Sequence, residues 1–114
     1  MVNYGLKDKV ALITGANNPQ GIGATTAFAF AREALTRSIA LEVAKYGITV
    51  NCVAPGPTQT GWIDTDLEQS VLPVIPMGKL IQPEDIAETI IFLASEQARM
   101  LTGQVIKVSG GHAL

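Results

Sequence analysis

Cysteine, histidine and aromatic residues are scarce in this chain. It has one cysteine, Cys52, and one histidine, His112, which excludes an internal disulfide and argues against a zinc cluster. Acidic residues outnumber basic ones by 10 to 8 without a basic stripe, so no nucleic-acid partner is expected. No apolar run reaches the roughly 20 residues of a membrane span, and residues 1–8 lack the apolar core of a signal peptide. These absences predict a cytoplasmic protein with no metal site and no membrane contact.

The composition is that of a chain able to fold. Of its 114 residues, 47% are hydrophobic and 16% are charged, which permits a hydrophobic core and excludes disorder by composition. The length allows one domain at most. Residues 1–114 are therefore expected to form a single domain.

The chain is organised around a glycine-rich loop that lies between a short apolar strand, Lys9–Ile13, and a helix. Glycine permits a tight exit from the strand, a close approach of the backbone to a pyrophosphate, and close packing of helix on strand. The helix N-terminus adds unpaired N–H groups that favour phosphate. A glycine-rich turn without a ligand is the alternative. The candidate cofactor residues in the loop are Gly15, Asn17, Gln20, Gly21, Ile22 and Gly23.

The remaining elements alternate between strand and helix. A helix is expected from Ile22 to about Lys45, with Gly47 as its stop signal, and a β-branched strand at Ile48–Val53. A sharp turn at Ala54–Pro57 opens a loop that runs to about Gln82. A second helix begins at Pro83 and ends near Ala98, and a third strand covers Gln104–Val108. This order predicts an α/β fold, a truncated Rossmann-like three-stranded parallel sheet with two main crossover helices.

The first helix has two apolar faces instead of one. Helical spacing places four of its apolar residues on one side and three on another; the first set is Ala27, Phe30, Ala34 and Leu41, and the second is Phe28, Leu35 and Ile39. An ordinary surface helix shows a single stripe. Either a partner chain buries the helix on a second side, or two half-helices are joined near residues 32–34, each with an apolar pattern suited to different surroundings.

Several motifs together resemble the short-chain dehydrogenase/reductase family, and within it the bacterial 3-oxoacyl-acyl-carrier-protein reductases. The segment 9–15 with Gly21–Gly23 resembles the family's first strand and cofactor loop, and residues 34–42 resemble the helix that follows its active-site tyrosine and lysine. The late motifs also match; they are Ile48–Gly56, Gln82–Ala87, Phe92–Ser95, Thr102–Gln104 and Gly110–Gly111.

One departure from the family pattern concerns catalysis. The family places a tyrosine and a lysine four positions apart on a helix, with a serine on the preceding strand. Here Tyr4 is followed four residues later by Asp8, and Tyr46 by Val50. Tyr46 is expected to pack at the helix end. The family's second to fifth strands are also missing, so an internal deletion near residues 32–34 is expected and no catalytic residue is assigned.

The resemblance implies a cofactor, NAD or NADP, bound weakly because part of its site is missing. On the nicotinamide side it implies the turn Pro55, Gly56, Thr58 and Thr60, with the backbone of Thr58 at the carboxamide. Two hypotheses follow: an oxidoreductase that reduces a 3-oxoacyl thioester or similar carbonyl, or a non-catalytic remnant or assembly module. A three-stranded sheet in the order 1-2-3 leaves one face bare, which predicts a homo-oligomer or an aggregating chain.

Overall fold

The structure is a computed structural model that describes residues 22–112, with side chains from residue 31 onward. The chain divides into two compact units, which are described separately below. The first comprises Met1–Cys52 and Phe92–Val105, and the second Val53–Ile91 and Ile106–Leu114. The predictions for the strand Lys9–Ile13, and with it the strand order 1-2-3, lie outside the described residues.

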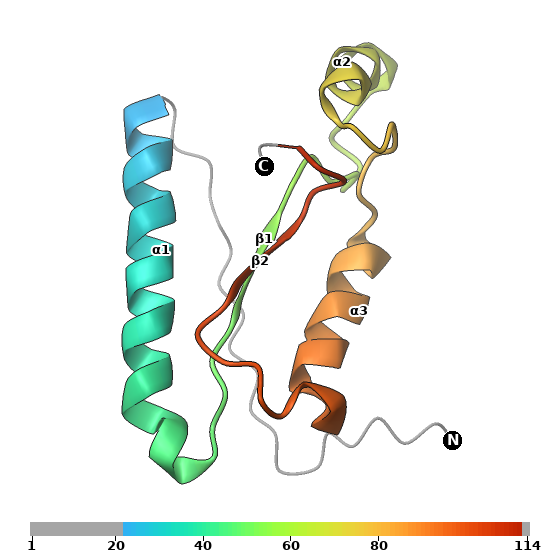
Figure 1. Cartoon of the computed structure of the whole chain (residues 1–114). Coiled ribbons are helices and arrows are strands. Elements are labelled where there is room, and N and C mark those ends of the chain that lie inside the picture. The colour runs from blue at the N-terminus through green and yellow to red at the C-terminus, as the bar shows by residue number, and fades with distance from the viewer. Residues whose placement is uncertain (1–21, 113–114) are drawn as a thin grey trace, which may run out of the picture. The chain divides into compact units, whose positions relative to one another are not determined.

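The described part of the chain contains two strands, β1 (Cys52–Pro55) and β2 (Val105–Val108), which pair side by side (Figure 1). Cys52 N–H donates to the carbonyl of Gln104 at 2.8 Å, and Gly56 N–H donates to that of Val108 at 2.9 Å. From the first bond to the second, the residue numbers increase in the same direction along both strands, so the strands are parallel. The predicted α/β class with parallel strands is confirmed, and β2 begins one residue after its expected start.

The middle strand expected at Ile48–Val53 is displaced along the chain: β1 begins only at Cys52 and continues to Pro55, so the predicted turn begins too early. The segment before β1 is held by a backbone bond, in which Gly103 N–H donates to the carbonyl of Val50 at 2.7 Å, and by side chains. Thr102 Oγ1 accepts from Val50 N–H at 3.0 Å, and Asn51 Nδ2 donates to the carbonyl of Leu101 at 2.9 Å. Ile48 is 47% exposed. Local side-chain bonds of this kind compete with regular pairing.

The first helix, α1 (Ile22–Val43), matches its prediction. It continues as a 3-10 turn at Ala44–Tyr46 and ends at Gly47, whose φ of 73° is left-handed. Glycine adopts this conformation without strain, which explains why the helix ends at this residue.

In the part of α1 where side chains are described, most residues of the two predicted apolar sets are exposed. Thr36 and Ala40 are buried, whereas Leu35 and Leu41 are 62% and 80% exposed. A Cβ on Gly103 would lie 3.6 Å from the Cβ of Ala40, so the helix approaches this turn with its small side chains. Because the helix lies close to this turn, small side chains occupy its inner side and the large ones lie on its outer side. Ile39 is half-buried, Ala34 is exposed, and the side chains of Ala27, Phe28 and Phe30 lie outside the described set.

The second predicted helix is α3 (Pro83–Ala94), which begins as expected but ends four residues early. Ser95 is extended, with φ −83° and ψ 167°, and a separate 3-10 turn follows at Glu96–Ala98. The start is fixed by Asp85, whose Oδ2 accepts from Gln82 N–H at 2.8 Å, as expected of an acid at a helix N-terminus.

The segment predicted as a continuous loop up to Gln82 contains a helix, α2 (Thr65–Val71), followed by a 3-10 turn at Leu72–Val74. Asp64 caps α2, because its Oδ1 accepts from Leu67 N–H at 2.9 Å. The cap and the acids of the first turn, Asp66 and Glu68, were a readable helix signal. Within residues 22–112, no helix is both long and apolar enough to cross a membrane.

Candidate functional site: the turn after β1

The predicted site residues fall into two groups. Gly15, Asn17, Gln20 and Gly21 lie outside the described residues, and Ile22 and Gly23 are the first two residues of α1. The other predicted residues all lie in the second unit, in or just after β1; they are Pro55, Gly56, Thr58 and Thr60. The structure therefore gives geometry for the turn after β1.

Gly56 packs more tightly than any side chain would allow. A Cβ at this position would lie 2.9 Å from both Cα and Cβ of Ser109, and 3.3 Å from Cδ1 of Ile81. Ser109 is 5% exposed and Ile81 is also 5% exposed, so neither has free space to move into. Glycine is required here for close backbone approach and not for a positive φ, since Gly56 has none.

Thr58 forms an isolated parallel bridge with Ile81. Gln59 N–H donates to the carbonyl of Ile81 at 2.9 Å, and Ile81 N–H donates to that of Pro57 at 3.1 Å. These bonds leave the N–H and C=O of Thr58 itself on the opposite side of the strand. The Thr58 hydroxyl donates to the carbonyl of Gly56 at 2.8 Å, which fixes the turn. The result is a rigid extended segment with one donor and one acceptor pointing away from its partner.

The loop beyond Thr58 is held by a residue that sequence reasoning missed. Gln59 Oε1 accepts from Gly61 N–H and Gln59 Nε2 donates to the carbonyl of Ile63, both at 2.9 Å. These two hydrogen bonds close residues 59–63 into a small loop. Trp62 lies within it and is 86% exposed, and Thr60 is exposed as well. A glutamine two residues before a glycine was the available signal, although it is weak.

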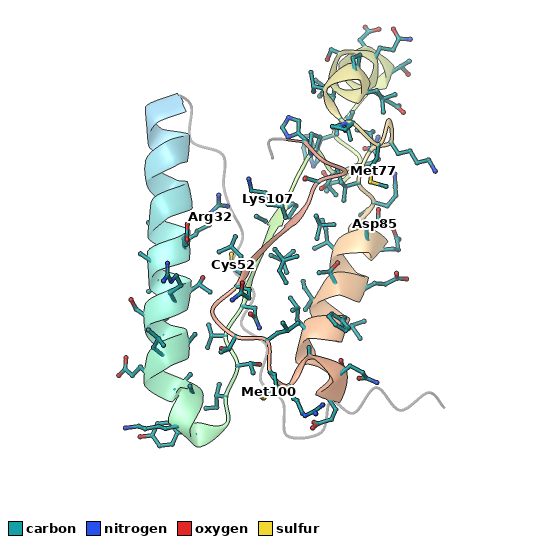
Figure 2. All side chains as sticks on the ribbon, in the orientation of Figure 1. Arg32, Cys52, Met77, Asp85, Met100 and Lys107 are labelled. Carbon is teal, nitrogen blue, oxygen red and sulfur yellow. The ribbon has the colours of Figure 1, made fainter. Side chains whose placement is uncertain are left out.

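The C-terminal segment of the second unit contacts the 58–81 loop through Gly110. Met77 N–H donates to the carbonyl of Gly110 at 2.9 Å, and a Cβ on Gly110 would lie 2.9 Å from Cγ2 of Ile75. Ile75 is 2% exposed. Met77 lies on the segment between α2 and α3 (Figure 2). The 58–81 loop is thus anchored twice, at the Thr58–Ile81 bridge and at Gly110.

Proton donors and metal ligands are sparse in the described region. Tyr46 is 69% exposed and lies under the Lys45 ammonium, whose Nζ is 5.1 Å from the ring centroid, so the expectation that it packs at the helix end is wrong. The helix ends in open surroundings, which explains its exposure. Among residues 22–112 no three His, Cys, Asp or Glu side chains gather where they could hold a metal ion.

Comparison with known proteins places this geometry in a family. The family model described as enoyl-(acyl carrier protein) reductase matches residues 31–113, which include both strands and the whole turn. The chain belongs to the short-chain dehydrogenase/reductase family. The match begins at Ala31, beside the predicted junction at residues 32–34.

Individual members of the short-chain dehydrogenase/reductase family, compared by sequence or by solved structure, agree with this assignment. The 3-oxoacyl-(acyl-carrier-protein) reductase FabG of Staphylococcus aureus is 46% identical over 80 residues, covering 68% of this chain and 32% of that protein. The FabG of Rickettsia felis is 37% identical over 111 residues, covering 95% and 46%. The crystal structure of 3-oxoacyl-(acyl-carrier protein) reductase from Brucella melitensis superposes with a TM-score of 0.70 at 29% identity, covering 74% and 32%. The chain thus spans a third to a half of these relatives.

Proposed function

We propose that this chain is part of an NAD- or NADP-dependent oxidoreductase that reduces a 3-oxoacyl thioester or similar carbonyl. The observation that carries the proposal is the turn after β1, where Gly56 is pressed against Ser109 and Thr58 keeps an N–H and a C=O on its open side. The similarity to FabG proteins supports the substrate class. A cytoplasmic location is part of the same proposal.

The residues present fit the nicotinamide end of such a cofactor. A carboxamide has one donor group and one acceptor, and the backbone of Thr58 offers the complementary pair. Thr60 adds an exposed hydroxyl for the amide or a phosphate. Gly56 lacks a side chain where the backbone must lie flat against Ser109. The dinucleotide, when bound, supplies the hydride, and Gly15 to Gly23 would hold its pyrophosphate.

The isolated chain is proposed to have no turnover. Tyrosine and lysine at a spacing of four are missing from the sequence, and general acid–base catalysis typically contributes about 10²–10⁴-fold. The test is an ultraviolet assay of NADPH oxidation with an acetoacetyl thioester, in which we expect the buffer rate. Turnover that disappears in Gly21→Trp, which blocks the proposed pyrophosphate loop, would show that the chain is an active enzyme.

Cofactor binding is tested separately from turnover. Only part of the dinucleotide's contacts remain, so calorimetry should give an affinity no better than about millimolar, or roughly −4 kcal/mol. Binding should be lost in Gly21→Trp. Micromolar binding would contradict the proposed deletion near residues 32–34, because a chain that lacks half of the site should not reach it.

A second function, that of an assembly module, is favoured by the exposed apolar side chains of α1. Leu35 and Leu41 are large apolar side chains that are mostly exposed, as expected for a helix that a second chain covers. We propose a homo-oligomer. Sedimentation should show species heavier than the monomer, and a stable monomer at low concentration with cooperative unfolding would contradict the proposal. Leu41→Lys should shift any oligomer toward monomer.

A further inference from the structure

The close contact between Gly56 and Ser109, in which a Cβ on Gly56 would lie 2.9 Å from Cα of Ser109, joins two turns. In the turn after β1, the Thr58 hydroxyl donates to the carbonyl of Gly56 at 2.8 Å. In the turn after β2, His112 N–H donates to the carbonyl of Ser109 at 3.1 Å. Thr58 and His112 are therefore tied to opposite sides of one contact. Ligands of open α/β sheets bind beyond the carboxyl ends of the strands, which is where both turns lie.

The turn that carries His112 has a fixed backbone. Its central residues, Gly110 and Gly111, have φ of 60° and 92°, and positive φ at both central positions is the pattern of a type I′ turn. A Cβ on Gly111 would lie 3.0 Å from Cγ of Pro76, so the turn packs against that segment without room for a side chain. His112 itself is half-buried. The turn thus holds His112 close to Ser109, and with it close to the candidate site.

His112 is the chain's single histidine, and its chemistry has no counterpart in the segments that contact its turn. These segments, residues 55–58 and 75–77, contain no ionisable side chain. A neutral imidazole has one donor and one acceptor nitrogen. Because the Thr58 hydroxyl already donates to Gly56, His112 is suited to complete the hydrogen bonds of an uncharged polar group bound at this place.

The nicotinamide carboxamide is such a group, and Thr58 satisfies only half of it. A carboxamide has two N–H donors and an oxygen with two lone pairs. The open side of the Thr58 backbone offers one acceptor and one donor, which leaves one N–H and one lone pair of the carboxamide without a partner. A polar group that stays unpaired in a closed site lowers affinity. A second hydrogen-bonding group is therefore needed beside Thr58.

We propose that His112 is the second anchor of the nicotinamide carboxamide, and that its unprotonated ring nitrogen accepts the amide N–H that Thr58 leaves unpaired. This rests on the proposed cofactor binding and deepens it, because it adds a side chain from the C-terminal turn to a site otherwise made of backbone groups. The role of His112 is to bind and orient the carboxamide, and no proton transfer is assigned to it.

The experiment follows the Cε1 proton of His112 by nuclear magnetic resonance, and its signal is unambiguous because no other histidine exists. The full chain is titrated with NADH at about pH 8, where an ordinary histidine is neutral. We expect the signal to shift and a nuclear Overhauser effect to connect the imidazole with the nicotinamide ring. If calorimetry detects NADH binding while the His112 signal stays in place, the proposal is overturned and the proposed reductase function stands.

His112→Phe and His112→Gln test the hydrogen bond itself. Both variants and the wild type are titrated with NADH and with its 3-acetylpyridine analogue, in which a methyl group replaces the amide nitrogen and its hydrogens. The preference for NADH should fall about fivefold in His112→Phe, the equivalent of one hydrogen bond. His112→Gln keeps an acceptor and should retain most of the preference. The same preference in the wild type and in His112→Phe would overturn the proposal.

A ligand without the rest of the dinucleotide separates this contact from cofactor binding. The cation 1-methylnicotinamide carries the carboxamide, and 1-methyl-3-acetylpyridinium is its control of equal charge without amide hydrogens. We expect the first to shift the His112 signal and the second to shift it less. If this holds while NADH does not bind, the proposed cofactor binding fails and the contact of His112 with the carboxamide stands. Equal shifts from the two cations, or no shift from either, would overturn the contact.

Discussion

The two ends of the β1–β2 pair are finished in opposite ways. At the N-terminal end, Gly103 N–H donates to the carbonyl of Val50, and side chains add to this pairing: Thr102 accepts from Val50 N–H, while Asn51 bonds both Leu101 and Gln104. At the C-terminal end, Gly56 donates to Val108 and lies so close to Ser109 that no Cβ fits between them. One end adds replaceable polar side chains to its backbone bonds, and the other requires the absence of a side chain.

The two ends therefore differ in how easily their contacts can be replaced. A polar tie at a half-exposed position can be replaced by water at modest cost. A close backbone contact between buried neighbours cannot be relieved without moving the chain. The end that tolerates no change also carries the open N–H and C=O of Thr58, which the proposed cofactor needs. The predictions below test this contrast, beginning with the largest effect.

Gly56→Ala should be the most damaging of these changes. The added methyl would lie 2.9 Å from Cα of Ser109, a backbone atom that cannot rotate away. Overpacking of this kind costs about 1–3 kcal/mol. Urea unfolding followed by circular dichroism should show the loss, and hydrogen exchange at the Gly56 amide, which donates to Val108, should accelerate.

Gly78→Ala is the matched control for that prediction. Gly78 has a φ of 69° and nothing within 4 Å of its missing Cβ, so alanine there meets only the left-handed backbone penalty of about 1–2 kcal/mol. It should leave the exchange of the Gly56 amide at its wild-type rate relative to global stability. If Gly56→Ala is as stable as the wild type, the close contact with Ser109 does not govern this end.

Asn51→Ala should have a smaller and local effect. It removes the donor to Leu101 and the acceptor for Gln104 N–H at 3.1 Å, both at exposed sites. We expect about 1 kcal/mol, and about fivefold faster exchange at the Gln104 amide. Asn51→Asp, which keeps the acceptor, should protect that amide. Equal acceleration at the Gly56 amide would break the comparison, because the two ends would then open as one.

The sequence predicted the fold best where one signal dominated. Gly47 ended the first helix as expected, and Val105–Val108 formed a strand, as its β-branched residues favour. The start of β1 was misplaced because the side chains of Asn51 and Thr102, 51 residues apart, form hydrogen bonds with the backbone of the opposite segment. Contacts across that distance in the chain leave no local pattern. The early end of α3 at Ala94 has a local cause, since Ser95 is extended and its hydroxyl donates to the carbonyl of Phe92.

The candidate site was predicted in part. Pro55, Gly56, Thr58 and Thr60 were chosen through family resemblance, and the structure adds why Gly56 must be glycine and which side of Thr58 is open. The outward Trp62 and its tie to Gln59 were missed, since a side-chain bond within five residues follows from loop conformation and not from periodicity. Helical spacing groups the apolar residues of α1 by side without indicating which side lies inward, so the burial of Thr36 and Ala40 was not predicted. The single-domain assignment, its junction near residues 32–34 and the glycine-loop residues stay predictions.

Thr102→Ser should produce the smallest change. Serine keeps the oxygen that accepts from Val50 N–H at 3.0 Å and loses one methyl from a half-buried site, which costs within about 0.5 kcal/mol. Thr102→Val keeps the shape but removes the acceptor, and should cost about 1 kcal/mol. Exchange at the Val50 amide should therefore rise clearly in the valine variant and little in the serine variant. If the order is reversed, the methyl and not the hydroxyl holds this end, and the proposed contrast between polar ties and close contacts fails.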